Sequence, residues 1–235
     1  MTPMRSDEAA ARFRALRASV HQVNLALPRA GLVTMHSGNA SGLDRETGLV
    51  LIKPSGVDYD TLRPEDLVVL TLDGEHVPAA GVPDRVASRL RPSVDTPHHL
   101  ALYRGDPTIG GVIHTHSNYA SAWAAAGRPI PCALTALADE FGGEVPCAPY
   151  APNEGDAIGD AILAHRTRAP AILLANHGVF AFDATPRKAL KAAAMVEDAA
   201  KTMWLAVQLD EVPPLPPAEI DQWWDRYHST YGQAE

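Results

Sequence analysis

The sequence has few cysteines and no long apolar run. Its 235 residues include only Cys132 and Cys147, which do not form a Cys-x-x-Cys pair. Two cysteines are too few for a disulfide framework, so we expect a reducing compartment and two small, buried apolar side chains. No uninterrupted apolar stretch approaches the roughly 20 residues of a membrane span. Residues 1–17 also lack the apolar centre of a signal peptide. We therefore expect a cytoplasmic protein that does not contact a membrane.

Positive charge is also scarce. The chain has 20 lysines and arginines against 28 acidic residues, a net charge of −8, which argues against nucleic acid as a partner. Neither glycine-rich nucleotide motif is present, and no Gly-x-Ser-x-Gly or Cys–His arrangement indicates a covalent nucleophile. A small phosphorylated substrate stays compatible with this charge, because local dipoles and single basic residues decide its binding.

Hydrophobic residues make up 46% of the chain, enough for a substantial core. We find no repeat and no interdomain linker, so residues 1–235 are expected to form a single domain. Short β-like segments alternate with amphipathic ones, which indicates a layered α/β or α+β fold with many antiparallel strand pairs. Helices are predicted over residues 6–27, 95–105, 118–126, 156–165, 186–209 and 220–229, and strands over residues 32–35, 49–52, 67–71, 111–115, 171–175 and 179–182.

The strongest chemical signal is a His-Thr-His sequence at the end of the strand predicted over residues 111–115. Residues i and i+2 of a strand face the same side, so His114 and His116 form a natural pair of metal ligands. His177 lies between two apolar strand patterns, and Asp95 lies at a predicted helix start. Three imidazoles and one carboxylate suit zinc and leave a position for substrate. Taken singly, the histidines could be ordinary strand-end residues and Asp95 a helix N-cap.

Two short polar segments form a second signal. They are Ser37-Gly38-Asn39-Ala40-Ser41 and Lys53-Pro54-Ser55-Gly56. Hydroxyl groups, exposed backbone N–H groups and a lysine can together hold an anion such as phosphate. Either segment alone could equally be an ordinary turn.

In combination, these motifs resemble the class II aldolase/adducin-like family, and within it the epimerases that act on L-ribulose 5-phosphate. The resemblance runs nearly end to end. It is carried by Ser37-Gly38-Asn39, by Ile52-Lys53-Pro54-Ser55-Gly56-Val57-Asp58-Tyr59, by Asp95-Thr96-Pro97, by Ile113-His114-Thr115-His116-Ser117, by Asn176-His177-Gly178 and by Tyr231-Gly232-Gln233.

The resemblance implies a fold, a cofactor and a set of site residues. The fold would be an α/β three-layer sandwich with a central, largely antiparallel sheet flanked by helices. One zinc ion per subunit would be bound by Asp95, His114, His116 and His177, and manganese or cobalt would also suit these ligands. Substrate phosphate would be held by Gly38, Asn39, Lys53, Ser55, Gly56 and Ser93. Asp139 and Tyr231 would be the acid/base pair, acting in a homotetramer with its sites at subunit interfaces.

The implied reaction is inversion at C4 of L-ribulose 5-phosphate to give D-xylulose 5-phosphate, by retro-aldol cleavage and re-addition. Asp95 favours the epimerases, because phosphate aldolases of the family have Glu there. Val94 departs from the epimerase pattern, which has a second serine, and Asn118 replaces a familiar arginine. Residues 149–156 are more similar to the aldolases. The alternatives are a fuculose-phosphate-type aldolase that releases dihydroxyacetone phosphate and an aldehyde, and a non-enzymatic scaffold of the adducin type.

Overall fold

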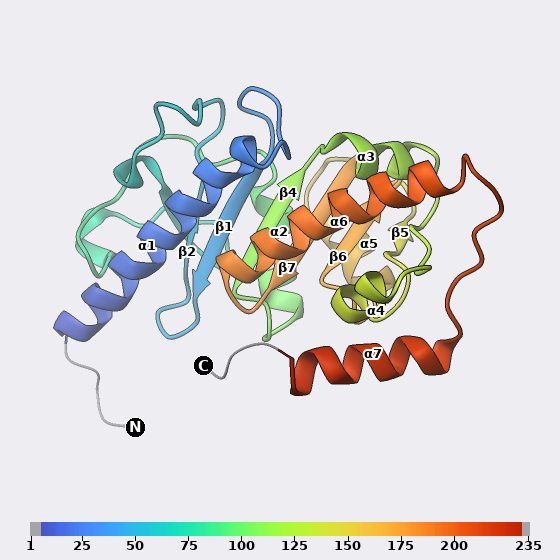
Figure 1. Cartoon of the computed structure of the whole chain (residues 1–235). Helices are drawn as coiled ribbons and strands as arrows, with labels where there is room; N and C mark the ends of the chain where they lie inside the picture. The colour runs from blue at the N-terminus through green and yellow to red at the C-terminus, as the bar shows by residue number, and fades with distance from the viewer. Residues whose placement is uncertain (1–5, 232–235) are drawn as a thin grey trace.

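A computed structural model describes residues 6–231 as a mixed sheet with helices on both faces (Figure 1). The strands are β1 (Asn39–Asp44), β2 (Leu49–Ile52), β3 (Val68–Thr71), β4 (Gly111–Thr115), β5 (Cys147–Ala148), β6 (Ala171–Leu174) and β7 (Gly178–Asp183). The helices are α1 (Ser6–Arg29), α2 (Thr96–Gly105), α3 (Asn118–Ala125), α4 (Thr135–Phe141), α5 (Ala157–His165), α6 (Pro186–Ala206) and α7 (Pro217–Ser229), with short 3-10 turns at Pro64–Asp66 and Ala79–Gly81.

The sheet has seven strands in the order β3-β2-β1-β4-β7-β6-β5. Neighbouring strands run antiparallel except β5 and β6, which are parallel. The prediction of a largely antiparallel sheet is therefore confirmed. In the centre of the sheet, β4 pairs with β1 on one side and with β7 on the other. Residues from three distant parts of the sequence therefore meet at the ends of these central strands.

Side chains that alternate between the two faces of β4 explain why helices cover both faces of the sheet. Ile113 packs in the hydrophobic cluster that contains Ala193 of α6, whereas Val112 packs in the cluster that contains Leu102 of α2 and Ile158 of α5. Successive strand residues point to opposite faces, so both faces of the central strands are apolar and each needs a helical cover. In Figure 1, α1 and α6 cross the near face of the sheet, and α2 and α5 lie behind it.

The first predicted strand is wrong, and a neighbouring strand was missed. Residues 32–35 are irregular, with a bend at Thr34 and a turn at Met35, whose φ is positive at 54°. Residues 39–44 form the fully buried β1, although residues 37–41 were interpreted from sequence as an anion-binding segment or an ordinary turn. Gly42 permits this burial, because a Cβ at that position would lie 2.7 Å from the side chain of Val20 and 2.9 Å from that of Leu16. The space left by glycine lets α1 pack closely on the sheet.

The remaining helix predictions differ mainly at their ends. The first helix continues through Pro28 to Arg29, because a proline in the last turn removes a single backbone donor without breaking the preceding turns. Thr185 accepts a hydrogen bond from the Lys188 N–H and so caps α6. This helix ends at Ala206 rather than at residue 209. The short elements α4 and β5 were not predicted.

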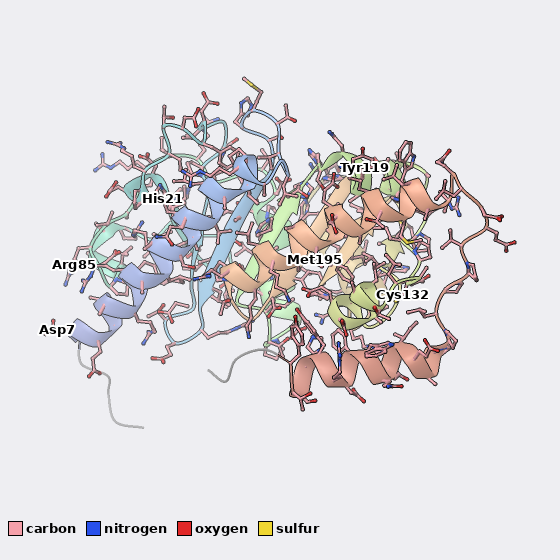
Figure 2. The ribbon with its side chains drawn as sticks, in the orientation of Figure 1. Asp7, His21, Arg85, Tyr119, Cys132 and Met195 are labelled. Carbon is pink, nitrogen blue, oxygen red and sulfur yellow. The ribbon has the colours of Figure 1, made fainter. Side chains whose placement is uncertain are left out.

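The cysteines form no disulfide among the described residues. Cys132, labelled in Figure 2, is 2% exposed, and burial raises the pKa of its thiol to about 11. Cys147 is half-buried, and burial raises its pKa as well. Both thiols therefore stay protonated and behave as small packing residues. Within residues 6–231, no helix combines the length and the hydropathy that a membrane span requires.

Candidate metal centre and active site

Three imidazoles meet where β4 ends and β7 begins. His114 is on β4, His116 follows two residues later, and His177 immediately precedes β7. Because these strands are antiparallel and Thr115 pairs with Val179, the end of one strand lies beside the start of the other. The Nε2 atom of His114 is 3.0 Å from Nε2 of His116 and 3.2 Å from Nε2 of His177. The structure therefore gathers the three predicted histidines into one group that can hold a metal ion.

Local contacts hold His114 in the form that binds metals. Its Nδ1 lies 2.9 Å from the carbonyl oxygen of Val179, which accepts the ring N–H, so the lone pair is left on Nε2. Its ring stacks on Phe180 with 4.3 Å between centroids. Burial lowers the pKa of His114 to about 4 and also lowers the pKa of His177. Neutral imidazoles with fixed tautomers are the required ligand state.

Asp95 directly precedes α2, yet its side chain makes no capping hydrogen bond. Instead, Oδ2 accepts hydrogen bonds from Asn39 Nδ2 at 2.7 Å and from Ser93 Oγ at 3.3 Å. Burial opposes ionisation of this carboxyl group, but the nearby His114 and the Asn39 hydrogen bond outweigh it and lower the pKa of Asp95. Asp95 therefore occupies the N-cap position of α2, but its side chain does not cap the helix. An ionised, oriented carboxylate lies close to the histidines instead.

The donor set fits a divalent cation. In a tetrahedral site with metal–nitrogen distances of about 2.0–2.1 Å, ligand nitrogens lie roughly 3.3 Å apart. The observed separations of 3.0 and 3.2 Å approach this value. Among the described residues, the group of possible metal ligands consists of the three imidazoles alone, and the Asp95 carboxylate lines the same cavity as His116 and His177. Imidazoles with a nearby carboxylate suit zinc, manganese or cobalt.

A cavity of about 230 Å³ opens beside the imidazoles. Its lining contains Asp95, His116 and His177 together with all the residues expected to hold phosphate. These are Gly38, Asn39, Lys53, Ser55, Gly56 and Ser93. The cavity also exposes residues that sequence reasoning did not assign to it, including His36 and Asn153. Val94 is 69% exposed at this cavity and presents methyl groups where the epimerase pattern has a hydroxyl group.

Lys53 supplies the charge of this cavity at a cost in stability. Its side chain is 1% exposed, and its Nζ lies 4.7 Å from the ring centroid of Tyr59. The hydrogen-bond contacts of Nζ are long, 3.4 Å to the carbonyl of His36 and 3.5 Å to that of Pro54. Burial lowers the pKa of Lys53 to about 8. A buried ammonium with such weak partners gains a strong one when an anion binds.

Gly38 marks a close approach of backbone to the metal ligands. Its φ is +70°, and a Cβ there would lie 2.9 Å from the carbonyl oxygen of His114. Only glycine combines this conformation with this contact. The chain before β1 can therefore lie directly against the histidine strand, which places Asn39 within reach of Asp95.

The two residues expected to be the acid/base pair lie elsewhere on the chain. Asp139 is on α4, with its Oδ2 at 3.7 Å from Arg226 Nη2. Tyr231 follows α7, stacks on Tyr227 with 4.8 Å between centroids, and is 64% exposed. Neither residue lines the histidine cavity in the described chain. Gly232 and Gln233 of the same sequence motif lie outside the described residues.

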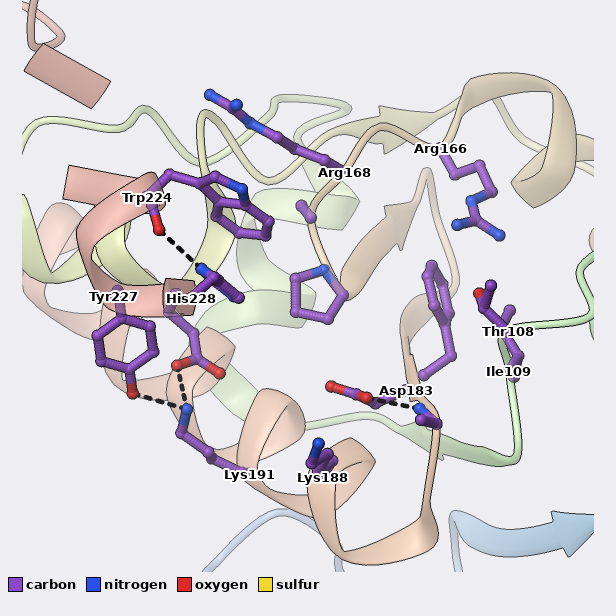
Figure 3. A pocket seen from close by; sticks show the side chains of 15 residues that line it. Thr108, Ile109, Arg166, Arg168, Asp183, Lys188, Lys191, Trp224, Tyr227 and His228 are labelled. Carbon is purple, nitrogen blue, oxygen red and sulfur yellow. Dashed lines mark hydrogen bonds and ion pairs between the residues drawn. The ribbon is translucent and has the colours of Figure 1, made fainter. Parts of the chain in front are cut away.

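A larger cavity, of about 430 Å³, lies at the opposite ends of β4 and β7 (Figure 3). It contains several basic side chains, but three of them are neutralised by carboxylates. Arg166 pairs with Asp106, Arg168 with Asp221 and Lys191 with Glu140. In the described chain it contains no group of metal ligands like that of the smaller cavity. The smaller cavity, which His116 and His177 line, is therefore the candidate active site.

Comparison with known proteins agrees with this geometry. Residues 18–204 match the model of the Class II Aldolase and Adducin N-terminal domain. The chain is 41% identical over 202 residues to the L-ribulose-5-phosphate 4-epimerase UlaF of Salmonella paratyphi B, covering 81% of this chain and 85% of that protein. The corresponding protein of Salmonella typhi shows the same identity and coverage.

Solved structures show the same architecture. An L-fuculose 1-phosphate aldolase superposes with a TM-score of 0.80 at 27% identity, covering 91% of this chain and 96% of that one. YgbL of Klebsiella pneumoniae, a putative aldolase/epimerase/decarboxylase by its title, has a TM-score of 0.76 at 26% identity, with 90% and 98% coverage. With a family match over most of its length and the fold of these enzymes, the chain belongs to the class II aldolase and adducin family.

Proposed function

We propose that this protein is a metal-dependent epimerase that inverts C4 of L-ribulose 5-phosphate to form D-xylulose 5-phosphate. The observation that carries the proposal is the 41% identity to an L-ribulose-5-phosphate 4-epimerase over 81% of the chain. The site supports it, because Lys53 lines the same cavity as His116 and His177, two members of the group of three histidines. A phosphorylated ketose needs both features.

The proposed chemistry breaks and re-forms the C3–C4 bond. Removal of the proton from the C4 hydroxyl group drives the cleavage, and the electron pair of the broken bond stays on the three-carbon fragment. The other fragment is glycolaldehyde phosphate, which Lys53, Ser55 and Ser93 hold by its phosphate group. Rotation of its aldehyde group before re-addition inverts C4. A divalent cation at the histidines supplies Lewis-acid stabilisation for the negative charge that develops.

We propose zinc as this cation and Asp95, His114, His116 and His177 as its ligands. Asn39 and Ser93 then have two roles. They bind the substrate phosphate, and their hydrogen bonds orient the Asp95 carboxylate. Support comes from the tautomer of His114 and from the lowered pKa of Asp95, which hold both groups in the forms that bind metals.

We further propose that Asp139 and Tyr231 exchange the proton of the C4 hydroxyl group from opposite faces of the aldehyde, and that they act on a neighbouring copy of the chain. Both lie outside the cavity of their own chain, and both are close to Arg226, whose guanidinium carbon is 5.9 Å from the Tyr231 ring. A homotetramer with sites at its subunit interfaces would bring this pair to the next histidine cavity.

The second candidate is a sugar-phosphate aldolase that releases its aldehyde. It is favoured by the TM-score of 0.80 to an L-fuculose 1-phosphate aldolase. Incubation of zinc-loaded protein with L-ribulose 5-phosphate, followed by NMR, separates the two functions. Conversion to D-xylulose 5-phosphate without free aldehyde supports the epimerase. Accumulation of a free aldehyde and a free ketone fragment would assign the chain to the aldolases instead.

A further inference from the structure

One side chain enters the histidine cavity from a segment that contributes nothing else to it. Asn153 lies between β5 and α5 and lines the cavity together with His116 and His177. The neighbouring Glu154 does not line it, although it is exposed in the same segment. The contact of Asn153 with the cavity therefore depends on the orientation of its own side chain.

A buried histidine fixes this orientation. His98 Nε2 lies 2.8 Å from Asn153 Oδ1, and the His98 side chain is 1% exposed. The ring of His98 packs edge-on against Phe180, with 6.2 Å between centroids, and its backbone N–H bonds the carbonyl of Asp95 at 3.1 Å. A neutral imidazole with its proton on Nε2 donates to the amide oxygen. The amide nitrogen then keeps both of its N–H donors without a partner in the described chain.

The contacts of His98 place Asn153 at the metal end of the cavity. The helix α2 begins directly after Asp95, and His98 lies in its first turn. His98 is close enough to His177 to act on it electrostatically. The anion-binding group, in contrast, is built by Lys53 and Ser55 after β2. A sugar phosphate anchored by its phosphate would present its remaining oxygens to the histidines and to Asn153.

We propose that Asn153 is a specificity-determining residue that donates a hydrogen bond from its amide nitrogen to a sugar oxygen at the metal end of the cavity. This inference rests on the proposed sugar-phosphate function. Asn153 would recognise the unphosphorylated part of the substrate through this hydrogen bond. His98 would act as a positioning residue that orients the amide nitrogen toward the cavity. A preorganised donor of this kind favours a ligand that carries the matching oxygen, by the contribution of one hydrogen bond.

Two ligands separate this role from a structural one. Inorganic phosphate probes the anion site alone, and L-ribulose 5-phosphate probes the anion site and the sugar contacts together. Titration calorimetry of zinc-loaded wild type, Asn153→Leu and the loop control Glu154→Gln gives both dissociation constants for each protein. Metal content and thermal midpoint are measured on the same samples.

We expect Asn153→Leu to weaken binding of L-ribulose 5-phosphate by roughly five- to tenfold, the range for loss of one hydrogen bond. Binding of inorganic phosphate, zinc content and thermal midpoint should match wild type, and Glu154→Gln should match it throughout. Unchanged affinity for L-ribulose 5-phosphate would overturn the inference, as would an equal weakening of both ligands.

The same data distinguish this inference from the proposed function. If wild type binds L-ribulose 5-phosphate without converting it, and Asn153→Leu still weakens that binding selectively, the epimerase function fails and the role of Asn153 stands. If wild type converts L-ribulose 5-phosphate but the variant binds it equally well, the function stands and Asn153 is only a loop residue. Absence of any binding to wild type would overturn both.

Discussion

Replacing Lys53 by methionine should make the protein more stable while impairing its anion site. The pKa of Lys53 falls from 10.5 to about 8 because the ammonium group is buried. A pKa shift of roughly 2.5 units corresponds to about 3 kcal/mol of unfavourable free energy in the folded state at pH 7. Methionine keeps most of the length of the side chain and removes the charge. The long hydrogen-bond contacts of Nζ, at 3.4 and 3.5 Å, offset little of this gain.

The effect should depend on pH in a defined direction. Below pH 8 the lysine is protonated in both the folded and the unfolded state, so the full penalty is present. Between pH 8 and 10.5 the unfolded chain binds a proton that the folded chain has released, so the stability of wild type rises with pH. The advantage of Lys53→Met over wild type should therefore shrink across this window.

Thermal unfolding of metal-free protein, recorded from pH 7 to 10.5, measures this difference. An increase of about 3 kcal/mol corresponds to a rise of roughly 6 to 12 °C at pH 7 for a chain of this size. Lys188→Met is the matched control, because Lys188 is exposed and its replacement should leave the midpoint almost unchanged. Equal or lower stability of Lys53→Met at pH 7, or an advantage that does not vary with pH, would refute the reasoning.

Further predictions concern the metal, the acid/base pair and one helix. His114→Asn should lose activity and most of its bound zinc by elemental analysis, and full metal content with full activity would disprove the ligand assignment. Tyr231→Phe should keep zinc but lose about 100-fold or more in turnover, the usual contribution of an acid/base group; wild-type kinetics would exclude that role. Mixed and reassociated His114→Asn and Tyr231→Phe proteins should regain part of the activity, because some shared sites then combine intact residues; no recovery would argue against sites built from two chains. Glu197→Gln should lower the free energy of unfolding by about 1 kcal/mol, since the Glu197 carboxylate accepts both the Tyr119 and Ala120 N–H groups at the start of α3; an unchanged urea midpoint would contradict this.

The metal centre could be predicted from sequence because it depends on local rules. The two-residue period of a strand places His114 and His116 on one side, and His177 lies at the boundary of two apolar strands, β6 and β7, that pair with each other. The phosphate segments were recognised for a similar reason, since hydroxyl groups, glycines and a lysine cluster along short stretches. His116, His177 and the phosphate residues line one cavity, and His114 lies buried beside His116 and His177.

Other features depend on contacts between distant segments, which no local pattern encodes. The strand β1 was missed because Asn39, Ser41 and Gly42 have low strand propensity, and pairing with β2 and β4 on both sides overrides that preference. Asn153 lies in an irregular segment, and its place in the cavity is set by His98, 55 residues away. Asp139 and Tyr231 could be named only through the family resemblance, and within one chain the structure leaves them apart from the histidines.

The central claim is that the two fragments of the substrate recombine on the enzyme with C4 inverted. It is tested most directly with L-ribulose 5-phosphate labelled with 13C at both C3 and C4, incubated with zinc-loaded protein and an excess of unlabelled glycolaldehyde phosphate. The account predicts D-xylulose 5-phosphate that retains the one-bond coupling between the two labelled carbons in the NMR spectrum. Loss of that coupling, or release of labelled aldehyde without inversion at C4, would contradict it.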